Sequence, residues 1–174
     1  LAQFFNATRI EDPEERINTM RANHEITMAT GARAGSSYLK GMMAEQLIEQ
    51  DNLVEAENWL NDAFELIENQ GERLWEGEVL RIQALLMCRQ DESQESVLTA
   101  LQRSVETSVA IGNRPFALRA ALSFYDQDHG SDKASDMIQQ ILLSYAVPDT
   151  TIEYQRAVGI VEGAVSTVSD SKAS

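Results

Sequence analysis

Apolar residues recur at helical spacing through most of the chain. In the stretch DNLVEAENWLNDAFELIENQG, residues 51–71, they are Leu53, Ala56, Leu60, Ala63, Phe64 and Ile67. This spacing of three and four positions places them on one face of an α-helix, with acidic and amide side chains on the other face. Gly71 follows, and glycine readily adopts the left-handed conformation that ends a helix. The pattern therefore predicts an amphipathic helix that ends at Gly71.

The same spacing continues in the segments on both sides. One apolar face comprises Trp75, Val79, Ile82 and Leu86, and the next comprises Val97, Leu101, Val105 and Val109. Short polar stretches such as QDES at 90–93 separate the apolar segments. The predicted helices lie near 1–9, 14–30, 35–50, 53–70, 73–89, 94–111, 115–128, 131–145 and 150–165. Because no segment requires a strand, the predicted fold class is all-α.

A short sequence, Gly-x-Arg, recurs between the predicted helices at 31–33, 71–73 and 112–114. Its copies start 40 and 41 residues apart, and each interval holds two predicted helices. A period of roughly 20–50 residues is typical of stacked repeats. The sequence thus predicts one repeat domain over residues 1–165 and a flexible C-terminal tail at 166–174. The predicted helix pairs lie near 1–30, 35–70, 73–111 and 115–145, followed by a closing helix near 150–165.

The helix pairs resemble tetratricopeptide (TPR) repeats. The matching positions in the best pair are Ala44 in the first helix and Ala56, Leu60 and Ala63 in the second. In the next pair Ala84 fits the motif, but Val97 and Ser104 replace its alanines. The motif's opening tryptophan is missing, and the period exceeds its usual value of about 34 residues. The resemblance implies a right-handed superhelix of stacked antiparallel helix pairs, a TPR-like α-solenoid of about nine helices.

A narrower resemblance concerns one bacterial family. The runs ENQGERLWEGEVLRIQALLM and GNRPFALRAALSF are similar to its C-terminal repeats, and the similarity covers about residues 12–165. Its most specific element is Gly71-Glu72-Arg73 followed by Trp75-Glu76-x-Glu78. Members are multidomain regulators with a class III adenylate/guanylate cyclase or winged-helix DNA-binding domain, a signalling ATPase, and a TPR-like array. The resemblance implies that this chain is the C-terminal part of such a regulator.

The charge of the chain narrows the classes of partner. Fourteen lysine and arginine residues face 28 acidic residues, which gives a net charge of −14. Phosphate recognition requires a basic surface, so we expect no direct contact with nucleic acid. The acidity confers solubility or forms an acidic surface for a basic partner.

No apolar run approaches the roughly 18–20 residues of a membrane span. Cys88 is the single cysteine, which excludes an internal disulfide. We expect a cytoplasmic protein without a membrane segment.

Candidate catalytic chemistry is sparse in the sequence. His24 and His129 lie far apart, and the sequence lacks the phosphate-loop motif GxxxxGK[ST]. His129 has Asp126 and Asp128 beside it, but one histidine with two acids in a turn is weak support for a metal site. Cys88 is expected to be a small packing residue. The prediction is that this segment is not an enzyme and has no catalytic residues, cofactor or metal site.

The expected stacking places the first helix of each pair on a concave surface. The candidate groove residues are Tyr38, Glu45, Ile48, Glu49, Glu78, Arg81, Leu85, Phe124 and Gln127. This mixture of apolar, acidic and basic side chains suits a peptide or a partner helix.

The repeated arginines and the tryptophans are expected to have structural roles. Each of Arg33, Arg73 and Arg114 is expected to bind the carbonyl groups that end the preceding helix, or to pair with a nearby acid. Trp59 and Trp75 are expected to pack between repeats.

Three hypotheses for function remain open at the level of the sequence. The first is a non-catalytic interaction domain that binds a protein, a peptide or other domains of the same parent chain. The alternative is a sensor that binds a small effector in the concave groove, which would require a pocket with convergent polar groups. The third is an enzyme with an unrecognised catalytic cluster.

A dimer could form through an uncapped apolar N-terminal helix that carries Leu1, Phe4 and Phe5.

Overall fold

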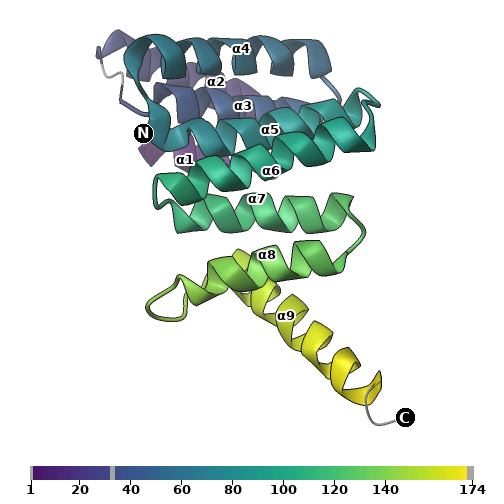
Figure 1. The fold of residues 1–174 in the computed structure, drawn as a ribbon. Coiled ribbons are helices and arrows are strands. Elements are labelled where there is room, and N and C mark those ends of the chain that lie inside the picture. Colours follow the sequence, from purple (N-terminus) through teal and green to yellow (C-terminus); the bar gives the residue numbers. More distant parts are fainter. Residues whose placement is uncertain (1, 32–33, 172–174) are drawn as a thin grey trace.

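The structure, a computed structural model, describes residues 2–31 and 34–171, with side chains for residues 4, 6–31 and 34–163. This part of the chain is helical and contains no strand, as predicted (Figure 1). The helices are α1 (Ala2–Ala7), α2 (Pro13–Ala29), α3 (Ser36–Glu49), α4 (Leu53–Gln70), α5 (Glu76–Arg89), α6 (Gln94–Ala110), α7 (Arg114–Gln127), α8 (Asp132–Leu143) and α9 (Ile152–Ser171). A short 3-10 turn, η1 (Arg73–Trp75), precedes α5.

The predicted boundaries differ from the structure mainly at the two ends. Helix α1 ends at Ala7, and Leu1 lies outside the described residues. Helix α9 continues to Ser171, so residues 166–171 are helical where the sequence predicted a tail. The residues after Gly163 include no further glycine and no proline, and these are the residues that end helices most effectively. Residues 172–174 of the predicted tail are not described.

The helices pack in chain order, and the odd-numbered helices also contact one another. Every helix contacts the next, and further contacts join α3 to α5, α5 to α7 and α7 to α9. Figure 1 shows α5, α6, α7 and α8 as successive rows, with α9 leaving the stack obliquely toward the C-terminus. The first helices of successive pairs therefore form one continuous layer.

The connections between helices repeat their backbone conformation. A left-handed glycine follows each of α2, α4 and α6: Gly31, Gly71 and Gly112, with φ of 77°, 72° and 73°. A left-handed residue also follows each of α3, α5 and α7: Asp51, Asp91 and His129, with φ of 61°, 57° and 54°. Gly35 and Gly130 are further left-handed residues in two of these connections. The predicted end of a helix at Gly71 is confirmed, since its N–H donates to the Ile67 carbonyl. The same backbone conformation thus recurs at three helix ends of each kind.

Several small residues are completely buried between the helices. Ala44, Ala56 and Ala63 are completely buried, as the resemblance to TPR repeats led us to expect. Ser104 replaces an alanine, and its buried hydroxyl donates to the Gly77 carbonyl at 2.6 Å, which satisfies the additional polar group. Phe4 is also completely buried within the core. It is therefore not part of an exposed apolar end; the side chains of Leu1 and Phe5 lie outside the described set.

Candidate functional site

Three of the predicted groove residues meet in a network of charges between α3 and α5. Arg81 on α5 donates to Glu45 on α3 at 2.5 Å. Its Nε and Nη2 atoms also donate to the two carboxylate oxygens of Glu78, at 3.1 and 2.9 Å. Glu78 and Arg81 are three positions apart on one helix, so their side chains lie on the same face. Both Glu78 and Arg81 are buried, so these two residues do not line an open groove as the sequence predicted.

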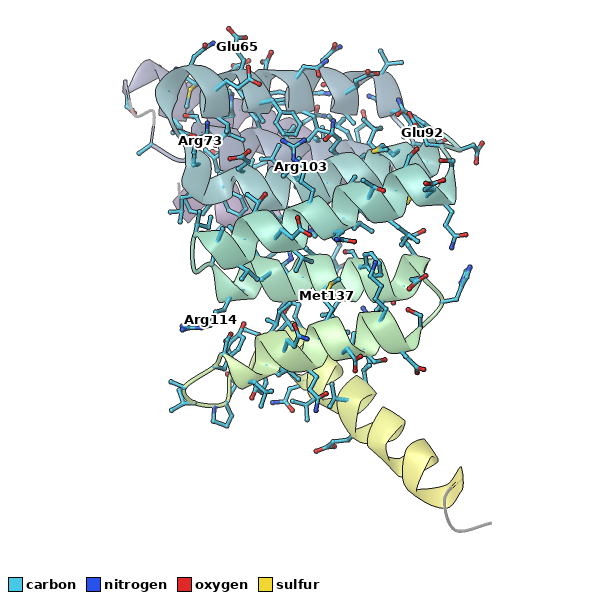
Figure 2. The ribbon with its side chains drawn as sticks, in the orientation of Figure 1. Glu65, Arg73, Glu92, Arg103, Arg114 and Met137 are labelled. Atoms are coloured by element: carbon cyan, nitrogen blue, oxygen red, sulfur yellow. The ribbon has the colours of Figure 1, made fainter. Side chains whose placement is uncertain are left out.

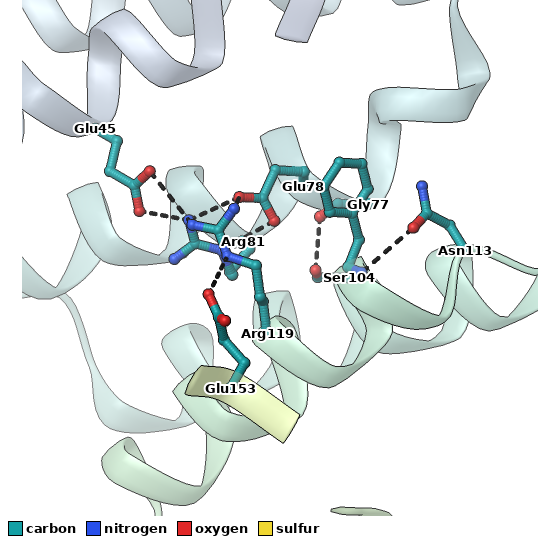
Figure 3. A network of polar contacts seen from close by, with 9 residues as sticks. Glu45, Gly77, Glu78, Arg81, Ser104, Asn113, Arg119 and Glu153 are labelled. Carbon is teal, nitrogen blue, oxygen red and sulfur yellow. Dashed lines mark hydrogen bonds and ion pairs between the residues drawn. The ribbon is translucent and has the colours of Figure 1, made fainter. Parts of the chain in front are cut away.

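Two residues that the sequence did not indicate extend this network to α7 and α9. Arg119 on α7 lies 2.6 Å from Glu78 and 3.6 Å from Glu45. Its Nε atom lies 4.0 Å from a carboxylate oxygen of Glu153 on α9. We call Glu45, Glu78, Arg81, Arg119 and Glu153 the charge network (Figure 3). It joins all four helices of the odd-numbered layer from α3 to α9.

Burial of the charge network decreases from its centre outward. The side chains of Glu78 and Arg81 are 1% and 5% exposed, whereas that of Glu153 is 45% exposed. Burial alone would lower the pKa of Arg81, but the charges and hydrogen bonds of Glu78 and Glu45 raise it above its ordinary value. Both carboxylate oxygens of Glu78 have guanidinium partners, and a guanidinium does not release a proton at physiological pH. The network is therefore suited to holding helices together, and less to proton transfer.

An aromatic cluster lies beside the charge network and also spans successive repeats. Trp75 stacks on Tyr38 with ring centroids 4.8 Å apart, and Phe116 lies 5.5 Å from Tyr38 and 5.9 Å from Trp75. Burial and the charge of Glu78 raise the pKa of Tyr38, while Arg119 opposes them. Trp75 thus packs between helices of successive pairs. Trp59 on α4 does the same on the other side of the fold, in a T-shaped contact with His24 on α2, and its N–H donates to Glu55.

The other predicted groove residues do not form an open trough. Phe124 is 1% exposed and Ile48 is buried, so both belong to the core and their assignment to the groove was wrong. Leu85 packs at the edge of the same core as Ile48. Glu49 is exposed, 3.7 Å from Arg16, and its pKa is raised by partial burial and by Glu45. Gln127 is half-buried, and its carbonyl accepts a hydrogen bond from Gln94. Close packing of α3 on α5, where Gly41 meets Val79 and Ile82, closes the expected groove.

The middle residue of the Gly-x-Arg sequence contacts the preceding repeat. Glu72 accepts hydrogen bonds from the backbone N–H groups of Gly35 and Ser37 and from the Ser37 hydroxyl. It therefore caps the N-terminus of α3, where Gly35 supplies no side-chain cap. Asn113, at the equivalent position, accepts from the Phe116 N–H, and its amide donates to the Leu74 carbonyl at 3.5 Å. Neither contact was indicated by the sequence, which directed attention to the arginines.

The arginines of this sequence have individual roles. Arg73 pairs with Glu76 at 3.0 Å and is largely exposed, in agreement with the predicted pairing to a nearby acid. Arg114 is exposed and forms no ion pair with any described residue. Arg33 lies outside the described residues.

The remaining candidate residues lie apart from the charge network. His24 on α2 is buried, and its pKa is lowered by burial and by Lys40. His129 is exposed in a turn. Cys88 is half-buried, and burial raises the pKa of its thiol.

The described residues contain neither a metal-binding cluster nor a membrane-spanning helix. No group of three or more histidine, cysteine, aspartate or glutamate side chains is placed to hold a metal ion there. No helix in that part of the chain is long and apolar enough to cross a bilayer.

Comparison of the chain with protein-family models, with curated proteins and with solved structures finds no match.

Proposed function

We propose that this chain is a non-catalytic interaction and regulatory domain built as a TPR-like α-solenoid. The observation that carries the proposal is the layer of first helices, in which α3, α5, α7 and α9 contact each other in chain order and share the charge network. A layer of this kind presents several repeats to a partner as one rigid surface. In this proposal the chain is the C-terminal part of a larger bacterial signalling ATPase, cyclase or transcriptional regulator in the cytoplasm.

The partner in this proposal is a protein or peptide segment with basic side chains, or another domain of the parent chain. The rim of the odd-numbered layer exposes the carboxylates of Glu49 and Glu153, with Glu45 partly exposed beside them. The net charge of −14 would attract a basic segment and accelerate its association. The buried centre of the network keeps the helices in register beneath this rim.

The alternative, a small-effector sensor that uses the predicted concave groove, has less support. Such a pocket needs polar groups that are available to a ligand. At the centre of the predicted groove, Glu78 and Arg81 are already paired with each other, with Glu45 and with Arg119.

The proposal is tested by reversing charge on the rim while the buried centre of the charge network, Glu78 and Arg81, stays unchanged. Glu49→Lys with Glu153→Lys changes one exposed and one half-buried residue, and Glu57→Lys with Glu65→Lys makes the same change in charge at two exposed residues of α4. Each purified form is immobilised and incubated with bacterial lysate at moderate salt, and bound proteins are identified by mass spectrometry. We expect a protein that the native chain and the α4 variant retain and that the rim variant loses. Equal retention by both variants, or no retained protein, would contradict the proposal.

A further inference from the structure

A cleft opens between α6 and α8 on the side of the even-numbered helices. Its volume is about 390 Å³, within the range of small-molecule sites. Its apolar wall comprises Val105 and Val109 from α6, Ala117 from α7, and Met137 and Ile141 from α8. Arg114, the first residue of α7, provides a positive charge in the lining. Figure 2 shows Arg114 at the beginning of α7 and Met137 between the ribbons of α7 and α8.

The two helices are bridged at one end and open at the other. Near the beginning of α8, Lys133 donates to Gln102 on α6 at 3.1 Å. Toward the ends of the same helices, Val109 is 56% exposed and lines the cleft together with Ile141. The cleft is thus a mainly apolar hollow at the ends of α6 and α8, and small-molecule sites are concave and largely apolar in the same way.

Arg114 is available to a ligand. Its side chain forms no ion pair with the described residues, although the chain carries twice as many acidic as basic residues. It lies in the first turn of α7, where the helix dipole contributes further positive potential. A guanidinium binds a carboxylate with two parallel hydrogen bonds. The cleft therefore combines one anion-binding group with an apolar wall.

The cleft is separate from the charge network. Ala117 in the cleft and Arg119 in the network are two positions apart on α7, which is about 200° around the helix. A ligand in the cleft would therefore contact α6, α7 and α8 without touching the ion pairs of the odd-numbered layer. The inference does not depend on the partner proposed for that layer.

We propose that this cleft binds a monocarboxylate with a medium-length apolar tail, such as a medium-chain fatty acid. The carboxylate pairs with Arg114, and the tail lies against Val105, Met137 and Ile141. Methionine is flexible and polarizable, so Met137 can adjust to tails of different shape. A single cation suits a single carboxylate, because a polyanion would bring further charges against an apolar wall and an acidic protein.

The test is a titration of the chain with octanoate, followed by NMR of the methyl groups of Val105, Met137 and Ile141. Arg114→Gln removes the charge from the cleft, and Arg103→Gln removes an exposed charge on α6 outside it. Val109→Trp should fill the cleft, and we expect it to fold because Val109 is largely exposed. Octanol serves as the uncharged ligand with the same tail.

We expect octanoate to shift these methyl signals in the low millimolar range or below. Arg114→Gln should weaken binding about tenfold or more, because a charge-assisted contact is lost. Arg103→Gln should have no effect, and Val109→Trp should abolish binding. Octanol should bind the native chain about as weakly as octanoate binds Arg114→Gln. The proposal is overturned by equal affinity in Arg114→Gln and native protein, by the absence of a shift at these concentrations, or by shifts confined to methyl groups outside the cleft.

Discussion

The odd-numbered helices and the even-numbered helices are held together by different kinds of contact. On the odd-numbered side, the carboxylate of Glu78 is shared by arginines from two helices and is buried. On the even-numbered side, the contacts between helices are more exposed and each joins two helices: Arg21 on α2 pairs with Glu55 on α4, and Lys133 on α8 bonds to Gln102 on α6. The buried charges of the odd-numbered side therefore fix the relative position of several helices at once, whereas each contact of the even-numbered side fixes two.

The largest expected effect comes from breaking the charge network. Arg81→Met should lower the free energy of unfolding by about 3–5 kcal/mol, because Glu78 would remain buried with Arg119 as its one basic partner among the described residues. On the even-numbered side, Arg21→Met should cost only about 0.2–1 kcal/mol, since that pair is partly exposed. Urea unfolding followed by circular dichroism measures both values.

A double variant separates the charge from the packing at this position. Glu78→Leu together with Arg81→Met removes both buried charges and should recover a large part of the stability lost in Arg81→Met. Similar losses for Arg81→Met and Arg21→Met would contradict the proposed difference between the two sides.

The next largest loss of stability is expected where α5 and α6 approach each other closely. A Cβ atom at Gly77 would lie 2.0 Å from the Ser108 hydroxyl and 3.2 Å from the Ser104 carbonyl. Gly77→Ala should therefore cost about 1–3 kcal/mol, measured by thermal unfolding. The matched change is Gly159→Ala on α9, where a Cβ would meet no atom within 4 Å. It should raise stability by up to about 1 kcal/mol through helix propensity. A neutral Gly77→Ala variant would show that these helices can separate without cost.

A smaller effect is expected at the joint between repeats. Glu72→Ala removes the cap of α3 and should cost about 1 kcal/mol, with faster hydrogen exchange at the Ser37 amide. Glu68→Ala, a nearby exposed change on α4, should leave exchange at Ser37 unaltered. Unchanged exchange in Glu72→Ala would show that the cap does not stabilise the beginning of α3.

The smallest effect depends on pH and concerns the even-numbered side. Burial and Lys40 lower the pKa of His24 below its ordinary value of 6.5, while Asp62 and Glu25 oppose them. The unfolded chain therefore binds a proton at His24 more readily than the folded chain. The free energy of unfolding should decrease as the pH falls through about 6.5, and this contribution should level off below the folded-state pKa. Denaturant titrations between neutral and mildly acidic pH should show a smaller decrease in His24→Gln. An identical pH profile in that variant would exclude this role for His24.

The features that the sequence predicted correctly depend on local pattern. The end of α4 at Gly71 follows from its conformational freedom, and the burial of Ala56 and Ala63 follows from helical spacing. Glu78 and Arg81 share a face because they are three positions apart on one helix. Each of these depends on residues that are close in the sequence.

The error at α7 came from the orientation of the helix about its axis. The predicted face included Phe124, but the side toward α5 carries Phe116 and Arg119. Successive residues of an α-helix point in directions about 100° apart, so an error of one position selects a different face. Because apolar residues surround much of α7, their spacing did not determine which side of the helix faces α5. The single charge at Arg119 within the apolar run FALRAALSFY was the available signal. Glu153 could not be found in this way, because its contact depends on how α9 returns to α7.

The cap supplied by Glu72 has a consequence for the order in which the chain can fold. During synthesis the beginning of α3 leaves the ribosome before Glu72, which is 35 residues beyond Ser37. Until then the first turn of α3 lacks this acceptor, and Gly35 supplies none from its side chain. Asn113 also contacts an earlier segment, but as a donor to the Leu74 carbonyl, 39 residues before it. A nascent chain that is interrupted before Glu72 therefore leaves the beginning of α3 without its cap and prone to fraying.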